Sequence, residues 1–310
     1  KGEKMCEDDY EIPKEVKRYT IPAAKDIYRH KESYYKRAVK LQEVLCNEKI
    51  DALCYQAASS PILLYDLMIA RLNSVQFYVT QHELFSQSMV TMDNTIVSRS
   101  VLFQLADKVI TLSEIERVYL ETLGIKACYI PNPCPIKGVK KALEMNDKKD
   151  IVWVGRLDKF QKRYQDIAPI MKLVVNKIPQ AKLKIYGIAD TFEDEFHLKN
   201  LIKKHNLENN IKYCGYTTDI ESIYQNAGVH LVTSAYESFS MVIFESHSFG
   251  IPLVTYDMPY LSLLEDDAGS IIVAQKDYNA AANAIIRLLE DDKYRVQVGQ
   301  AALNGIKKFD

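Results

Sequence analysis

The sequence has neither an excess of charge of one sign nor a long apolar run. Its 310 residues carry 40 basic and 41 acidic side chains, a formal charge of −1, which argues against a general nucleic-acid binder but allows a local basic cleft. No apolar stretch approaches the roughly 20 residues that span a bilayer, and the opening KGEKMCEDDYEIPKE is too polar for a secretory signal. We expect a cytoplasmic protein of about two globular domains.

The cysteines also lack the spacing of a metal site. None of them forms a C-x-x-C pair, and none has the Cys/His spacing typical of zinc. We therefore expect reduced thiols, no metal and no other cofactor. The six cysteines are Cys6, Cys46, Cys54, Cys128, Cys134 and Cys214.

Short apolar runs alternate with helical patterns throughout residues 50–136. This alternation indicates βαβ units and a mainly parallel sheet. The preceding segment, 31–50, predicts a helix with two interpretations: an amphipathic helix packed on a sheet, which we favour, or a helix whose basic residues contact an anionic membrane. Residues 1–20 supply neither a strand nor a Gly-rich turn, so we expect this first domain to be incomplete at its start.

Periodicity is lost over PNPCPIKGVKKALEMNDKKD, 131–150, where prolines and then charges gather around and after Asn132. Such a segment is typical of an interdomain linker. After it, six strand patterns alternate with helical patterns, which predicts a complete doubly wound α/β domain. The predicted organisation is therefore a Rossmann-like domain at 1–136, a linker at 137–149 and a second Rossmann-like domain at 150–310.

The segment ESFSMVIFE, 237–245, places two glutamates around an apolar helix start. Glu237 precedes the predicted helix and Glu245 lies about two turns further on. Gly250 and Pro252 then end the helix before the buried strand pattern LVTY. A strand-to-helix crossing in an α/β sheet is where ligands bind, and two carboxylates at this spacing suit a polyhydroxylated ligand.

Two cations follow the first strand of the second domain, Arg156 and Lys162. Fixed cations at a strand's carboxyl end can hold a diphosphate, and the free N–H groups of the helix that begins near Ser240 can meet the same phosphates. Two alternatives remain. Arg156 and Lys162 could be solvated surface charges, and Ser238 or Ser240 could act only as an N-cap. The sequence contains no D-x-D triplet, so these positive groups would replace a metal ion in neutralising the diphosphate.

The second half resembles the donor domain of retaining GT-B glycosyltransferases of family 4. The matching stretches follow the family's order over about 110 residues. They are VGRLDKFQK at 154–162, LKIYGIA at 183–189, the run from LIKKHNL to MVIFE at 201–245, and SFGIPLVTYDMPYL at 248–261. The resemblance implies a GT-B fold, in which two Rossmann-like domains face each other across a cleft.

The resemblance also implies a role for each matching residue. Arg156 and Lys162 would bind the donor diphosphate, Glu237 the transferred sugar and Glu245 the ribose hydroxyls. His82, in VTQHELF, would contact the donor sugar or the acceptor, and Asn132 would mark the hinge. Further donor-binding residues would be Gly155, Gly187, Tyr216, Ser238, Phe239, Ser240, Met241 and Val242. The family often has Gly where Ser240 stands.

We therefore expect a metal-independent glycosyltransferase that moves a sugar from a nucleoside diphosphate sugar to a hydroxyl of a glycan or lipid-linked acceptor. Retention would follow from front-face departure of the diphosphate, with cell-surface polysaccharide or glycolipid synthesis as the setting and peripheral membrane contact as an option. Two alternatives remain open: a nucleotide-sugar epimerase or phosphorylase of the same fold, and a non-catalytic partner subunit of another transferase.

Overall fold

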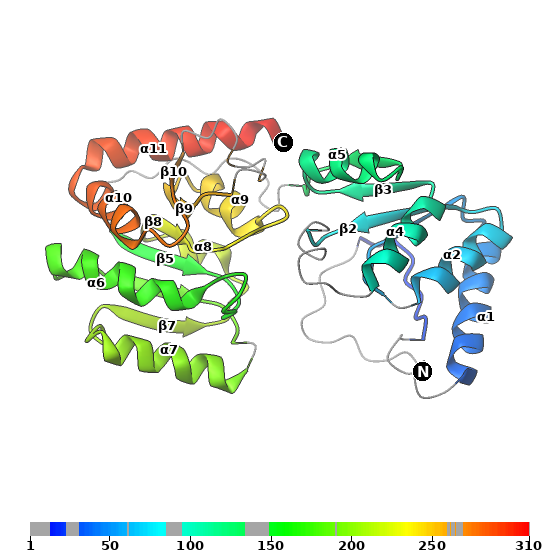
Figure 1. Ribbon diagram of the computed structural model, residues 1–310, viewed down its shortest axis with the longest axis horizontal. Coiled ribbons are helices and arrows are strands. Elements are labelled where there is room, and N and C mark those ends of the chain that lie inside the picture. The colour runs from blue at the N-terminus through cyan, green and yellow to red at the C-terminus, as the bar shows by residue number, and fades with distance from the viewer. Residues whose placement is uncertain are drawn as a thin grey trace. The chain divides into compact units, whose positions relative to one another are not determined.

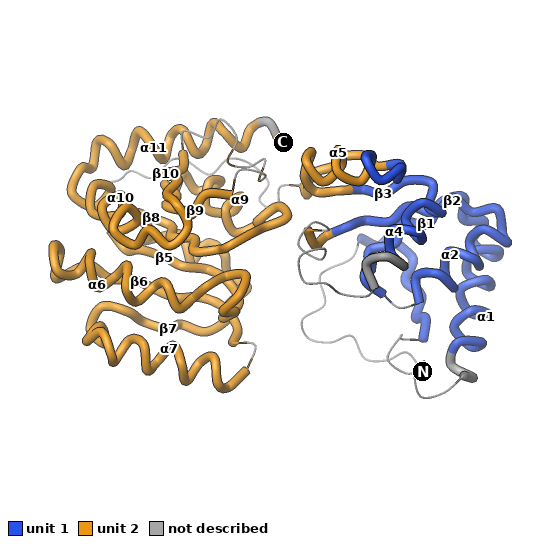
Figure 2. The backbone as a smooth tube through the Cα atoms, viewed as in Figure 1, with its two compact units in different colours: residues 1–81, 92–110, 121–126 blue, residues 82–91, 111–120, 127–310 orange. Residues whose placement is uncertain are grey.

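The computed structural model describes residues 13–22, 31–60, 62–84, 95–133, 149–189, 191–258, 261, 264 and 269–309. The chain forms two sheets flanked by helices (Figure 1) and divides into two compact units (Figure 2). Unit 2 consists of 82–91, 111–120 and 127–310, so it includes three short stretches of the first predicted domain, 82–91, 111–120 and 127–136. Most of the predicted linker, 137–149, lies outside the described residues, and the domain limits stay a prediction.

The first sheet has four strands in the order β1-β2-β3-β4, with β1 parallel to β2. Helices lie between the strands along the chain, as the alternating pattern predicts. The elements are α1 (Lys31–Asn47), β1 (Ala52–Tyr55), α2 (Leu63–Leu72), β2 (Gln76–Gln81), α4 (Thr95–Leu105), β3 (Lys108–Thr111), α5 (Glu114–Thr122) and β4 (Ala127–Tyr129).

An ion pair joins the first two helices, α1 and α2. Arg37 of α1 donates to both carboxylate oxygens of the buried Asp66 of α2, at 3.1 and 2.7 Å, and also to the main-chain oxygen of Pro22. A buried carboxylate requires such a partner. The helix predicted over 31–50 was expected to pack on a sheet; this ion pair joins it to helix α2 instead.

The second sheet has six strands, all parallel, in the order β10-β9-β8-β5-β6-β7. The elements are β5 (Asp150–Val154), η2 (Tyr164–Asp166), α6 (Ile167–Lys177), β6 (Leu183–Tyr186), α7 (Phe192–Lys204), β7 (Ile211–Gly215), α8 (Ile220–Tyr224), β8 (Ala227–Val232), α9 (Met241–Ser248), β9 (Leu253–Tyr256), β10 (Ser270–Val273), α10 (Tyr278–Glu290), α11 (Asp292–Gly305) and η3 (Ile306–Phe309).

The strand order reverses between β5 and β8. From β5 the chain proceeds outward to β6 and β7, then returns to β8 on the other side of β5 and proceeds to β9 and β10. This is the doubly wound order, in which ligands bind outside the carboxyl ends of the strands at the reversal. A ligand site is therefore expected at the loops after β5 and β8.

Both faces of the second sheet are buried, as a parallel sheet requires. Ile151 and Trp153 of β5 pack into a core with residues of α6 and α10. Val152, between them in sequence, points to the other face and packs with Tyr224 of α8 and Phe249. The predicted six strands and the helices between them are confirmed, with one difference: the single final helix predicted from 278 is two helices, α10 and α11.

Candidate functional site

Three glycines let the chain approach itself closely at the carboxyl edge of β5, β6 and β7. The N–H of Gly155 donates to the carbonyl oxygen of Tyr186, and that of Gly187 to the carbonyl oxygen of Gly215. A Cβ added to Gly187 would lie 1.8 Å from the carbonyl oxygen of Gly155, and Gly187 has a φ of +146°. Only glycine fits there, so the loops after β5 and β6 lie in direct backbone contact.

Lys162 and Glu237 meet across the reversal point. The Lys162 ammonium lies 2.5 Å from Oε1 of Glu237, with the two side chains 15% and 6% exposed. The hydroxyl of Ser234, two residues after β8, donates to the same Oε1 at 2.6 Å. The structure thus brings together two residues predicted for the site, one from each loop.

A second chain of hydrogen bonds fixes the main chain at Lys162. The indole N–H of Trp153 donates to the Thr233 hydroxyl at 2.9 Å, and this hydroxyl donates to the carbonyl oxygen of Lys162 at 2.8 Å. Since an indole N–H can only donate, the directions of both bonds are determined. The N–H of Ala235 donates to the carbonyl oxygen of Gln161 as well, so the two loops are joined at several points.

The residue after Lys162 is held in an unusual conformation. Arg163 has a φ of +53°, which costs a non-glycine residue about 1 kcal/mol or more. The carboxylate of Asp166 compensates by accepting from the Arg163 guanidinium and from the hydroxyls of Tyr256 and Tyr278, each at 2.9 Å. Burial beside this carboxylate raises the pKa of both tyrosines. The turn that presents Lys162 is therefore anchored to β9 and α10.

Arg156 lies on the same carboxyl edge, two residues after β5, and its side chain is exposed. Its guanidinium donates to the Gln161 side-chain oxygen at 3.4 Å. Gln161 in turn donates to the carbonyl oxygen of Tyr236 at 3.5 Å. Both predicted cations therefore belong to one loop beside the β5–β8 reversal.

The start of α9 presents a row of backbone donors. Among the described residues, nothing accepts a hydrogen bond from the N–H groups of Ser238, Phe239, Ser240, Met241 or Val242. Ser240 has a φ of +63°, and a left-handed residue among successive N–H groups is typical of anion-binding nests. The helix dipole adds a partial positive charge at this end. The segment can therefore receive an anionic group.

The alternative role of Ser240 as a side-chain N-cap is wrong. Ser240 occupies the N-cap position of α9, but its side chain makes no capping hydrogen bond. Its buried hydroxyl has no partner within the described part of the chain. The left-handed backbone explains this, because a capping side chain normally extends from β-region backbone.

Glu245 lies in the second turn of α9, half-buried. Burial raises the pKa of its carboxyl to about 7, because a low-dielectric environment disfavours the charged form. A carboxyl that titrates near neutrality inside a helix is uncommon for a purely structural residue. Its role as a ribose ligand stays a prediction.

Two predicted site residues, His82 and Tyr216, follow strands other than β5 and β8. His82 follows β2 directly and is exposed, which places it at the carboxyl end of a strand in the first sheet. Tyr216 follows β7 and is 63% exposed, two strands away from β5. Their roles in binding the sugar and the base stay predictions.

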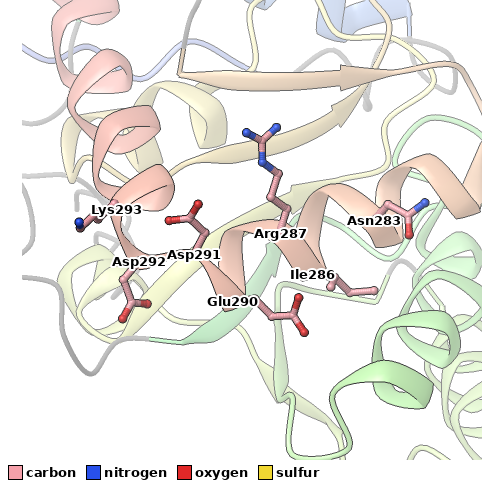
Figure 3. A pocket seen from close by; sticks show the side chains of 7 residues that line it. All are labelled: Asn283, Ile286, Arg287, Glu290, Asp291, Asp292 and Lys293. Atoms are coloured by element: carbon pink, nitrogen blue, oxygen red, sulfur yellow. The ribbon is translucent and has the colours of Figure 1, made fainter.

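Two hollows of the second unit lie near the amino ends of its strands, away from Lys162 and Glu237. One of about 600 Å³ is formed by the last turns of α10 and the first turn of α11 (Figure 3), where Arg287 and Lys293 mix with Glu290, Asp291 and Asp292. Another, of about 400 Å³, adjoins Asp150 at the amino end of β5. Neither contains a predicted site residue. Within the described ranges, no cluster of three or more His, Cys, Asp or Glu side chains is placed to hold a metal ion.

Sequence reasoning missed the residues that support the site: Trp153, Thr233, Ser234 and Asp166. Ser234 stands three residues before Glu237, a spacing that brings side chains together in a turn, and this was the available signal. Thr233 and Lys162 are 71 residues apart, so their contact follows only from the strand order.

Comparison with known proteins gives the family. Residues 137–304, more than half of the chain, match the family described as glycosyl transferases group 1. The poly(glycerol-phosphate) alpha-glucosyltransferase of Bacillus subtilis is 34% identical over 139 residues, which are 44% of this chain and 20% of that protein. An uncharacterised glycosyltransferase of Haemophilus influenzae is 26% identical over 235 residues, 74% of this chain and 64% of that protein. The chain thus spans less than two thirds of the length of these relatives.

Solved structures agree on the fold. The Anabaena protein Alr3699/HepE, crystallised with UDP and glucose, superposes with a TM-score of 0.73 at 18% identity, over 88% of this chain and 77% of the other. At this identity the likeness shows the architecture alone, which is the GT-B fold, as predicted. The family match, together with the doubly wound second sheet, establishes that this chain belongs to the glycosyl transferases group 1 family.

Proposed function

We propose that the protein is a retaining glycosyltransferase of family 4, which transfers a sugar from a nucleoside diphosphate sugar to a hydroxyl acceptor. The observation that carries this proposal is the carboxyl edge at the β5–β8 reversal. There Lys162 lies 2.5 Å from the Glu237 carboxylate, beside exposed Arg156 and the open N–H groups of 238–242. Cations and oriented amides at such an edge suit a diphosphate.

The proposed division of labour follows this geometry. Arg156, Lys162 and the amides at the start of α9 bind the diphosphate and stabilise it as it leaves. Glu237 contacts the transferred sugar, and Glu245 accepts hydrogen bonds from the ribose hydroxyls. Gly155, Gly187 and Tyr216 line the base and ribose side, and His82 contacts the sugar or the acceptor.

Because three positive elements neutralise the leaving diphosphate, we propose that transfer requires neither a metal ion nor another cofactor. Retention is supported by the Bacillus subtilis relative, whose name specifies an alpha-glucosyltransferase. An alpha product is what retention gives from an alpha-linked nucleotide sugar. The diphosphate oxygen would take the acceptor proton as it departs from the front face.

Product analysis tests the reaction class. Purified chain is incubated with UDP-glucose and other nucleotide sugars, with and without glycerol-phosphate polymer, and sugar products are separated by chromatography and NMR. A transferase forms an acceptor-linked alpha-glycoside and releases nucleoside diphosphate. An altered nucleotide sugar without acceptor identifies an epimerase, a phosphate requirement identifies a phosphorylase, and no turnover favours a non-catalytic partner.

The phosphate contacts are tested by Arg156→Ala and Lys162→Ala. Each should lower turnover about 100-fold or more, the scale of losing one preorganised charged contact in a transition state. Lys182→Ala is the matched control, because the Lys182 ammonium donates to the carbonyl oxygen of Asn209 next to the hollow at the amino end of β5. Full turnover in both site variants would exclude the phosphate role.

For the acceptor, we propose a cell-surface polysaccharide or glycolipid, in line with the poly(glycerol-phosphate) in the name of the Bacillus subtilis relative. The proposed location is the cytoplasm, at the inner face of the membrane. None of the helices in the described ranges is long and apolar enough to cross a bilayer.

Peripheral membrane contact is supported by the surface of α1 and α2. A largely apolar hollow of about 280 Å³ lies between these helices. Tyr35, Met68 and Leu72 beside it are 73%, 51% and 83% exposed, and Lys36 is exposed on the same helix as Tyr35. Sedimentation with anionic vesicles, but not with neutral ones, should fall when Tyr35 and Leu72 are changed to Ser.

A further inference from the structure

The Glu237 carboxylate is held through a single oxygen. Both Lys162 and Ser234 donate to Oε1, at 2.5 and 2.6 Å. Within the described residues no donor reaches Oε2. Glu237 and Ser234 are 5% and 2% exposed, and the two protein donors fix the position of Oε1.

A bound diphosphate changes this arrangement, if the proposed function holds. Lys162 cannot give its full charge to a phosphate while its ammonium is paired with Glu237. The phosphate therefore has to share or replace that partner. A buried carboxylate that loses its donors is strongly destabilised, and among the described residues the Ser234 hydroxyl is the one other donor to Glu237.

The main chain at Lys162 is fixed independently of this pair. Thr233 donates to the Lys162 carbonyl oxygen at 2.8 Å and accepts from Trp153. Thr233 and Ser234, adjacent at the end of β8, thus hold the two partners separately: one the Lys162 backbone, the other the Glu237 carboxylate. An exchange of partners then requires only the flexible Lys162 side chain to move.

We propose that Ser234 is a positioning residue that holds Glu237 in place while Lys162 leaves it for the donor diphosphate. The inference rests on the proposed function and deepens it, because it assigns Glu237 a second role. In the free protein Glu237 competes with phosphate for Lys162. Ser234 lowers the free-energy cost of releasing Lys162, because it continues to donate a hydrogen bond to Glu237. A hydroxyl that only stabilises the local turn would have no such link to phosphate binding.

A double-mutant cycle on nucleoside diphosphate affinity tests this link. UDP, GDP and ADP are titrated calorimetrically into the wild type, and the tightest of them into the variants. Ser234→Ala should weaken binding about tenfold, within the range for an unsatisfied buried acceptor. Glu237→Gln should bind at least as tightly as the wild type, because the competing charge is gone. The double variant should bind like Glu237→Gln within about twofold, since energies of coupled residues do not add.

Two controls separate positioning from general damage. Ser248→Ala removes an equally buried hydroxyl, which donates to the Phe244 carbonyl oxygen at 2.9 Å, and should leave affinity unchanged. Ser234→Thr restores the donor and should bind within about threefold of the wild type. If Ser234→Ala does not fold, Ser234→Cys replaces it, with a weaker donor of similar size and the same expected pattern.

Two results overturn the inference while leaving the proposed function intact. One is wild-type affinity in Ser234→Ala; the other is a loss in Ser234→Ala that persists undiminished in the Glu237→Gln background. Absence of binding of all three nucleoside diphosphates by the wild type overturns the proposed function, and the inference with it.

Discussion

At the scale of single residues, Ser240 carries a conformational cost that the site requires. Its φ of +63° is the left-handed region that glycine adopts freely. Its hydroxyl gains no hydrogen bond from the described residues in return. A strained residue at the start of a helix, beside a row of open N–H groups, is expected where backbone geometry serves binding.

Ser240→Gly should therefore raise the free energy of unfolding by about 0.5–1 kcal/mol, because relief of left-handed strain exceeds the added entropy of the unfolded chain. Urea denaturation at neutral pH measures it. Ser246→Gly, inside α9, is the matched control and should lower stability instead, since glycine weakens a helix interior. Equal destabilisation by both changes would contradict the strain assignment.

Glu245, the proposed ribose ligand, is expected to make nucleotide binding depend on pH near neutrality. With its pKa raised to about 7 by burial, the ionised form grows from a minor to the major species between pH 6 and pH 8. Only this form accepts hydrogen bonds from both ribose hydroxyls. Nucleoside diphosphate affinity should therefore increase about tenfold over this interval, as measured by calorimetry.

Glu245→Gln supplies the control for phosphate titration. The variant should bind more weakly at pH 8 and lose most of the increase between pH 6 and pH 8. An identical pH profile in the variant and the wild type would exclude Glu245 from the ribose contact.

At the scale of elements, the packing of α9 and α8 on β8 buries a histidine. His230 of β8 is fully buried, and neither ring nitrogen has a partner among the described residues. Its ring lies 5.7 Å from that of Tyr224, and burial, His247 and Lys162 together lower its pKa to about 3. The imidazole is therefore neutral in the folded protein at neutral pH.

Acid is expected to lower the free energy of unfolding through His230. Because the unfolded chain binds this proton near pH 6.5 and the folded chain does not, stability is complete above pH 6.5 and falls as pH decreases toward 3. The loss at pH 5 is about 2 kcal/mol, at 1.36 kcal/mol per pH unit. His230→Leu should remove this part of the acid destabilisation, measured as unfolding free energy between pH 7 and pH 5. A wild-type slope in the variant would contradict it.

Local sequence patterns predict individual strands and helices of this domain. Strands such as β8 and β9 were identified because buried parallel strands are continuous apolar runs, and α9 because Glu237, Gly250 and Pro252 mark its limits. The contacts that hold the site together were not predictable from such local patterns. The Trp153–Thr233 and Lys162–Glu237 contacts join residues 80 and 75 positions apart. Their pairing follows from β5 lying next to β8, which local patterns do not determine.

At the scale of the whole molecule, the region that matches the family contains the proposed donor-binding residues. Residues 137–304 carry the family match, and the six-stranded sheet within them carries both ends of the Lys162–Glu237 pair. The first sheet carries His82 directly after β2, and its contribution to the acceptor side stays a prediction. Donor chemistry is therefore expected to depend on the second sheet's carboxyl edge.

Calorimetric titration of UDP, GDP and ADP into the wild type, Arg156→Ala and the control Lys182→Ala tests this account most directly. The account predicts one bound nucleoside diphosphate per chain, an affinity about 10- to 100-fold weaker in Arg156→Ala, the range for a lost charge-assisted hydrogen bond, and wild-type affinity in Lys182→Ala. Wild-type affinity in Arg156→Ala, or no binding of any of the three to the wild type, would contradict it.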